Sequence, residues 1–136
     1  MPKNFVPQQG AAGWQMSNAQ IFPMAIHLAS LEIFDEATMQ KLRAKSQQLT
    51  SFFEFCLNDV IAKKSIELKI ITPKNPDERG CQLSLLTGEN GKALHKKLSD
   101  AGIISDWREP NVIRVAPVPL YNSFEEVWRF CEAISN

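Results

Sequence analysis

An arginine lies in the middle of a short run that alternates like a β-strand. In the run Val112–Ala116, the side chain of Arg114 should face away from those of Ile113 and Val115 because successive side chains of a strand point to opposite faces. A solvated sheet face is the simplest place for such an arginine, although its two neighbours on that side are apolar. A guanidinium on a rigid strand can also bind a carboxylate through two parallel hydrogen bonds. Arg114 is therefore a candidate binding residue.

The cysteines and histidines do not form a metal or redox pattern. Cys56, Cys81 and Cys131 are widely spaced and contain no CxxC pair, so we expect reduced core thiols rather than a disulfide framework. Only two histidines are present, which argues against a zinc site. His95 falls on the polar side of a predicted helix and is expected at the surface. His27 falls in an apolar helix, where we expect a packed and hydrogen-bonded side chain.

Motifs of several enzyme classes are absent from the sequence. It contains no GxxxxGK[ST], GxGxxG, HExxH or GxSxG, so nucleotide-loop, dinucleotide, zinc-protease and serine-hydrolase interpretations have no support. Two pairs of adjacent carboxylates, Asp35-Glu36 and Glu125-Glu126, stand at the starts of predicted helices. There they complement the helix dipole, which accounts for them better than acid–base catalysis does.

Charge and hydropathy exclude further classes of protein. The 136 residues carry 15 Lys and Arg against 15 Asp and Glu, whereas nucleic-acid-binding domains usually show a basic excess. The same balance disfavours binding to an anionic membrane surface. No apolar run approaches the roughly 20 residues of a membrane-spanning helix, and the first ten residues lack the apolar segment of a secretory signal. We expect one cytoplasmic domain without nucleic-acid or membrane partners.

Helical periodicity dominates the first half of the chain. Residues 1–18 contain proline and glycine with little periodicity and are expected to form an extended lead-in, in which Ser17 or Asn18 could cap the next helix. Residues 21–34 are apolar on nearly every side, as in helices buried against another domain or subunit. A longer helix with one apolar face is predicted over about 35–61.

The second half of the chain alternates between the periods of strands and helices. Gly102 stands where a helix would end in a left-handed turn, and Ser123 with Glu126 forms the pattern of a capping box. The expected strands are 66–70, 81–85, 103–107 and 112–116, and the expected helices are 92–101 and one that starts at Ser123. These elements predict an α/β (α+β) fold of two layers, in which helices cover a mainly antiparallel sheet of about four strands. A long helical segment precedes the sheet.

Four runs of residues resemble one enzyme family in the same order. They are Gly13–Asn18 (GWQMSN), Ala29–Asp35 (ASLEIFD), Arg79–Ser84 (RGCQLS) and Asp106–Phe124 (DWREPNVIRVAPVPLYNSF). From about residue 5 to its end, the chain is similar to the C-terminal part of kynureninases, which are much longer enzymes. The last run is long enough to be specific.

The resemblance implies a function and two site residues. Kynureninases are homodimeric hydrolases that depend on pyridoxal 5'-phosphate and have the aspartate-aminotransferase-like fold (fold type I). They cleave L-kynurenine or 3-hydroxykynurenine to anthranilate or 3-hydroxyanthranilate plus L-alanine, in tryptophan catabolism and NAD biosynthesis. The resemblance implies that Arg114 binds the substrate α-carboxylate and that Asn18 belongs to the cofactor site. Residues 19–136 would then be the C-terminal small domain of such an enzyme.

The resemblance also implies what this part of the enzyme lacks. The family's Schiff-base lysine, the aromatic residue that stacks on the cofactor and the aspartate that pairs with its pyridine nitrogen lie upstream of the matched region. We therefore expect this chain alone to hold no pyridoxal phosphate and to be catalytically inactive. The alternative is a stand-alone module that binds an amino acid or regulates another protein, without catalysis.

Overall fold

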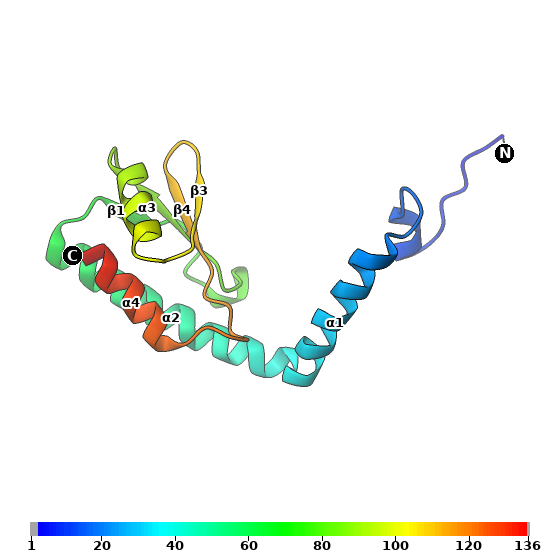
Figure 1. Cartoon of the computed structure of the whole chain (residues 1–136), viewed down its shortest axis with the longest axis horizontal. Helices are drawn as coiled ribbons and strands as arrows, with labels where there is room; N and C mark the ends of the chain where they lie inside the picture. The colour runs from blue at the N-terminus through cyan, green and yellow to red at the C-terminus, as the bar shows by residue number, and fades with distance from the viewer. Residues whose placement is uncertain (1–2, 136) are drawn as a thin grey trace. The chain divides into compact units, whose positions relative to one another are not determined.

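The computed structural model describes residues 3–135, and the chain separates into two compact units, Met1–Glu36 and Ala37–Asn136. The first unit contains a short 3-10 turn, η1 (Ala11–Trp14), and most of helix α1 (Ile21–Ala37). The second unit contains the sheet and the remaining helices (Figure 1). The lead-in expected to be extended therefore includes one turn of 3-10 helix.

Helix α1 begins two residues later than a cap at Asn18 would require. The carbonyl of Gln20 accepts the N–H of Met24 at 3.0 Å, so the predicted cap by Ser17 or Asn18 is wrong. Pro23 lies in the first turn, where its missing N–H costs nothing. The side chains from residue 21 to 33 are exposed in this chain, and none of the helices within residues 3–135 is long and apolar enough to cross a membrane.

The long helix of the second unit, α2 (Met39–Lys64), starts four residues later than predicted. Thr38 separates it from α1 with a φ of 63°, a region that β-branched residues rarely adopt. The two helices are separate, as predicted, but the boundary lies at Thr38 rather than at Asp35. Further along α2, Ser46 is buried among the apolar positions, and its carbonyl accepts the hydroxyl of Thr50 at 2.8 Å.

Four antiparallel strands form the predicted sheet. They are β1 (Leu68–Ile70), β2 (Leu83–Thr87), β3 (Asp106–Arg108) and β4 (Val112–Val115), in the order β1-β2-β4-β3. The central pair joins β2 to β4, which come from segments far apart in sequence. The sheet is therefore held together by a long-range pairing, with β1 and β3 at its edges.

Strand β3 begins later than predicted because the end of helix α3 (Gly91–Asp100) uses the backbone before it. Gly102 has a φ of 78° and its N–H donates to the Ser99 carbonyl, while the N–H of Ile103 donates to the Leu98 carbonyl at 3.0 Å. These two bonds define a Schellman motif, as Gly102 predicted. Because the Ile103 N–H is used there, pairing in the sheet starts only at Asp106.

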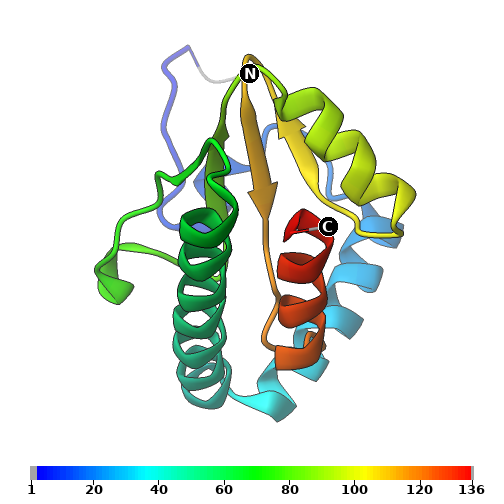
Figure 2. The same cartoon turned by 90° about the vertical axis from the view of Figure 1, so that its left-hand side faces the viewer.

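Helices α2, α3 and α4 (Phe124–Ser135) cover one face of the sheet. Figure 2 shows α2 and α4 side by side in front of the strands. Phe53 of α2 and Phe130 of α4 meet edge to face with ring centroids 5.0 Å apart, a geometry that adds to the gain from burial. The core also contains buried residues from every layer, among them Leu49, Leu57, Leu83, Leu85, Leu98, Ile113, Val127 and Ile134.

The predicted capping box starts α4. The Ser123 N–H donates to the Glu126 carboxylate at 2.7 Å, and the Glu126 N–H donates to Ser123 Oγ at 3.3 Å. Two backbone N–H groups at the helix start are thereby satisfied. The Ser123 N–H is the main cause of a lowered pKa at Glu126, followed by the side-chain amide of Asn122.

Candidate functional site

Arg114 lies on the face of the sheet opposite the helices. Alternation along β4 buries Ile113 and Val115 against the helices and leaves Arg114 on the other side, where 34% of its side chain is exposed. Its cross-strand neighbours are Ser84 on β2 and Asp106 on β3. The guanidinium is thus carried by the second strand from the edge, on a polar face.

Three charged side chains form a cluster on this face, which we call the arginine cluster: Arg108, Asp106 and Arg114. Arg114 Nε donates to Asp106 Oδ2 at 2.6 Å, and Arg114 Nη2 donates to the same oxygen. Arg108 Nε donates to that oxygen at 2.8 Å. The two guanidinium groups and one carboxylate leave a net positive charge, so the cluster can attract an anion.

Asp106 is ionised at neutral pH in this arrangement. Hydrogen bonds from Arg114 and then Arg108 lower the pKa of its carboxyl group below the ordinary value because both stabilise the charged form. The carboxylate therefore keeps its bonds to both arginines throughout the neutral range. The cluster is therefore a permanently charged group of side chains rather than an acid–base pair.

Asn18 lies in the first unit, in a bend that precedes α1, and its side chain is exposed. Arg114 lies in the second unit. Of the two residues assigned from the family resemblance, only Arg114 has a surrounding charged site among residues 3–135. The role of Asn18 in a cofactor site stays a prediction.

Asp106 is the site residue that pattern reasoning missed. It belongs to the long run that resembles the family, yet its pattern alone suggests only a turn-flanking acid. The predicted turn at Pro110 could have identified Asp106 as the partner of Arg114. Residues 106 and 114 lie at equal distances in sequence from Pro110, and such residues pair across a hairpin with a three-residue loop. The observed register confirms this pairing.

Arg79, in the run RGCQLS, has a structural role in this chain. Its Nη2 donates to Glu54 of α2 at 2.9 Å, and only 4% of the Arg79 side chain is exposed. Its Nη1 donates to the Pro73 carbonyl, and its own carbonyl accepts from Arg43. These bonds fix the loop between β1 and β2, which includes the 3-10 turn η2 (Pro76–Glu78), against α2.

The histidines do not join the arginine cluster or a metal site. His95 is half-buried, rather than at the surface as predicted, and its Nε2 lies 3.3 Å from the Ser105 carbonyl oxygen. His27 is exposed in this chain, so the packed and hydrogen-bonded side chain predicted for it is not found. Within residues 3–135, no three His, Cys, Asp or Glu side chains are grouped to hold a metal ion.

The cysteines are unpaired thiols, as predicted. Cys56 and Cys131 are buried in the core, and Cys81 is partly buried. Burial raises the pKa of Cys131 to about 12, with a further contribution from neighbouring Cys56. Burial also raises the pKa of Cys56, so both core thiols are protonated at neutral pH.

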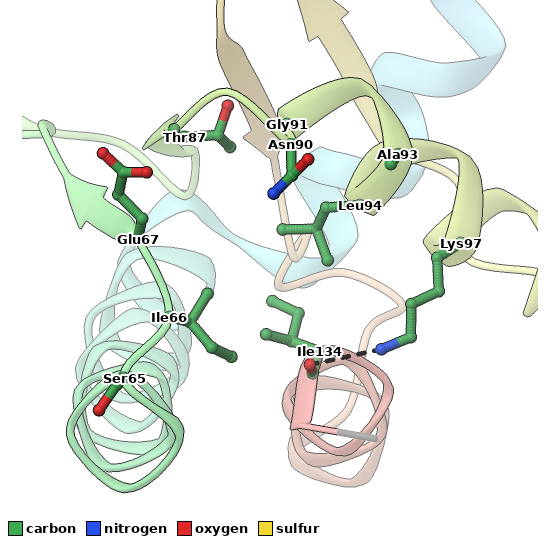
Figure 3. Close-up of a pocket in the computed structure, with 11 residues that line it drawn as sticks. Ser65, Ile66, Glu67, Thr87, Asn90, Gly91, Ala93, Leu94, Lys97 and Ile134 are labelled. Atoms are coloured by element: carbon green, nitrogen blue, oxygen red, sulfur yellow. Dashed lines mark hydrogen bonds between the residues drawn. The ribbon is translucent and has the colours of Figure 1, made fainter.

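A hollow of about 490 Å³ lies on the helix-covered side of the sheet (Figure 3). The side chains of Ile66, Leu94 and Ile134 face its interior, and Lys97 Nζ lies 3.5 Å from the Ile134 carbonyl. Neither Arg114 nor any other member of the arginine cluster lines it. The hollow is separate from the charged face of the sheet.

Comparison with known proteins identifies a family. The family described as "Kynureninase C-terminal domain" matches residues 42–134. The chain is 47% identical to the kynureninase of Flavobacterium johnsoniae over 96% of its own length, and 47% identical to that of Xanthomonas euvesicatoria over 98%. It is 46% identical to the kynureninase of Koribacter versatilis over 97%.

These matches cover only part of each relative. The chain spans 31% of the Flavobacterium johnsoniae protein, 32% of the Xanthomonas euvesicatoria protein and 30% of the Koribacter versatilis protein. The matched family region contains the whole sheet, α3, the arginine cluster and α2 from Leu42 onward, and reaches the last turn of α4. The chain therefore belongs to the kynureninase family, and residues 42–134 correspond to its C-terminal domain.

Proposed function

We propose that this chain is the C-terminal part of a pyridoxal-phosphate-dependent kynureninase. The complete enzyme would hydrolyse L-kynurenine or 3-hydroxykynurenine to anthranilate or 3-hydroxyanthranilate plus L-alanine. In this proposal residues 1–18 are a lead-in and residues 19–136 form the C-terminal domain. The part of the reaction assigned to this chain is recognition of the amino-acid end of the substrate.

The observation that carries the proposal is the position of Arg114. Its side chain is about one-third exposed on a face of the sheet that the three helices of its own unit leave free, and it lies in a cluster with net positive charge. A substrate with an α-carboxylate presents two oxygens to such a group, which can bind both through parallel N–H donors. The rigid strand then fixes where the carboxylate, and with it the α-carbon, is held.

The described residues do not by themselves fit a complete cofactor site. Asn18 is the residue proposed to contact the cofactor, and its exposed amide belongs to the first unit, whereas Arg114 belongs to the second. We therefore propose that the chain alone does not turn over kynurenine. No step of the reaction is assigned to its residues beyond binding and orienting the carboxylate.

Helix α1 supports a role at an interface in the complete enzyme. Ile21, Phe22 and Ile26 are 77%, 83% and 73% exposed in this chain, which is unusual for an apolar helix. A homodimer or contact with the rest of the enzyme would cover such side chains. We propose that α1 contributes to that interface.

A fusion tests the proposal directly. The C-terminal third of the Flavobacterium johnsoniae kynureninase is replaced by this chain over the aligned region. With pyridoxal phosphate, the fusion should release anthranilate from L-kynurenine, and the chain alone should release none. A fusion that folds and binds the cofactor without any turnover would contradict the proposed function, and turnover by the chain alone would contradict its predicted inactivity.

Variants of the fusion test the residue roles. Arg114→Lys should lower kcat/KM for kynurenine about a hundredfold, because lysine keeps the charge and loses the two-pronged geometry. Arg129→Lys is the matched control, since Arg129 pairs with Glu125 on the exposed side of α4. Asn18→Ala should weaken binding of the cofactor rather than of the substrate. If Arg114→Lys and Arg129→Lys lowered kcat/KM equally, Arg114 would not be a substrate-binding residue.

A further inference from the structure

The way in which Asp106 binds Arg114 leaves one end of the guanidinium free. A guanidinium offers two pairs of donors to a planar acceptor: one pair is Nε with Nη2, and the other is Nη1 with Nη2. Here Nε and Nη2 both donate to Asp106 Oδ2. Nη1 has no hydrogen-bond partner among the residues that the structure describes.

The position of Asp106 in the sheet makes this arrangement rigid. Asp106 and Arg114 are directly opposite each other in the β3–β4 register, so their side chains leave the same face side by side. Arg108, two residues further along β3, donates from its Nε to the same carboxylate oxygen at 2.8 Å. Asp106 is thus fixed between two arginines and can fix the plane of the Arg114 guanidinium in turn.

We propose that Asp106 is a positioning residue that holds Arg114 by its Nε side, so that the Nη1 end is presented to the substrate carboxylate. This inference rests on the proposed role of Arg114 and adds to it the end of the guanidinium that binds. An arginine side chain loses rotational freedom when it binds a ligand, and holding it beforehand lowers that cost. Arg108 compensates the charge of Asp106, so the cluster still attracts the substrate anion.

The opposite role for Asp106 makes a contrasting prediction. If Asp106 merely competed with the substrate for Arg114, its removal would free the guanidinium and tighten substrate binding. If Asp106 positions Arg114, its removal weakens binding despite the gain in net positive charge. The sign of the change in KM therefore separates the two roles.

The first test needs no ligand and uses the 136-residue chain. The chain is labelled with ¹⁵N-arginine, and the Arg114 Nε–H signal is identified by its loss in Arg114→Lys. In Asp106→Asn this proton should exchange with solvent at least about tenfold faster, since the charge-assisted bond is lost. Glu125→Gln, which removes the partner of Arg129, should leave the Arg114 signal unchanged. Backbone amide spectra show that each variant remains folded.

The second test uses the active fusion. Asp106→Asn should raise KM for L-kynurenine about tenfold with kcat changed by less than about threefold. Asp106→Glu should recover part of the loss, and Glu125→Gln should have the KM of the unsubstituted fusion. An unchanged Arg114 Nε–H signal, or a KM that is unchanged or lower in Asp106→Asn, overturns the inference.

The two tests separate this inference from the proposed function. An inactive but folded, cofactor-binding fusion contradicts the proposed function, whatever the NMR signal of Arg114 shows. An active fusion in which Asp106→Asn has no effect leaves the proposed function intact and removes the positioning role.

Discussion

Helices α1 and α4 are both rich in apolar residues, yet only α4 buries them in this chain. Val127, Phe130 and Ile134 of α4 lie on one face and are each at most 6% exposed. In α1 the apolar residues surround the helix, and Phe22 is 83% exposed. The local pattern is sufficient for a helix in both cases, and the distribution of apolar residues around it differs.

That difference shows how one apolar face on a helix contributes to a protein core. A helix with one apolar face can complete a core by packing on one surface, as α4 does against α2 and the sheet. A helix that is apolar on every side needs cover from more than one direction. The same apolar content therefore stabilises the second unit through α4 and stays exposed on α1 in this chain.

Truncating one phenylalanine in each helix should give the largest contrast. Phe130→Ala removes a buried ring that packs on Phe53 and should cost about 3 to 5 kcal/mol of unfolding free energy. Phe22→Ala on α1 should change it by less than about 0.5 kcal/mol. Urea dependence of hydrogen exchange at the β2 amides measures both. Similar costs would show that α1 belongs to the same core.

Thiol reactivity should separate the helices by orders of magnitude. With a pKa of about 12 instead of 9.0, Cys131 has about a thousandfold less thiolate near neutral pH. A thiol reagent followed by mass spectrometry should leave Cys131 unmodified in the folded chain. A cysteine introduced on α1 by Phe22→Cys should react at the rate of an exposed thiol. Rapid modification of Cys131 without unfolding would contradict its burial.

The two predicted helix caps should differ by a smaller amount. Ser123→Ala breaks the capping box of α4 and should cost about 1 kcal/mol. Ser17→Ala, at the cap that the sequence predicted for α1, should have no measurable cost because α1 starts at Ile21. The cost at Ser123 is measured from the urea midpoint of the second unit, and the cost at Ser17 from hydrogen exchange of the first amides of α1. A measurable loss of helix stability in Ser17→Ala would show that Ser17 caps α1 after all.

The smallest effect should be a pH dependence of the cap. The pKa of Glu126 is lowered in the folded chain, mainly by the Ser123 N–H, so the ionised carboxylate stabilises the fold. This contribution is present above the unfolded pKa of about 4.3 and is lost as the pH falls through the lower folded pKa. The stability lost in Glu126→Gln should therefore be constant near neutral pH and shrink below about pH 4. If the stability lost in Glu126→Gln did not change with pH, the ionised Glu126 carboxylate would not be the form that stabilises the fold.

Much of the fold could be predicted because its signals are local. Alternation of apolar and polar residues predicted the four strands. Gly102 predicted where α3 ends, and the Ser123–Glu126 pair predicted where α4 begins. The predicted fold class, a small C-terminal domain of the aspartate-aminotransferase-like kind, is confirmed. The late start of β3 was not predicted, because the Ile103 N–H donates to a carbonyl at the end of α3 instead of to a neighbouring strand. Hydrophobic periodicity carries no information about such a hydrogen bond.

The candidate site was less predictable because it depends on register and distant contacts. Strand alternation predicted the face of Arg114, but its partner follows only from the pairing of β3 with β4. The partly buried bond between Arg79 and Glu54 joins residues 25 positions apart, which no local pattern indicates. The sequence motif was sufficient to identify Arg114, whereas its partner Asp106 was identified only in the tertiary structure.

The β3–β4 register has a consequence for how this gene can change. Arg114 and Asp106 stay on the same face only while equal numbers of residues separate each from the turn at Pro110. A single codon deleted between Val112 and Arg114 would place the arginine opposite Leu85, and a single inserted codon would place it opposite Leu83, in both cases on the helix-covered face. Substitutions in the turn should therefore be tolerated far better than changes in the length of either strand.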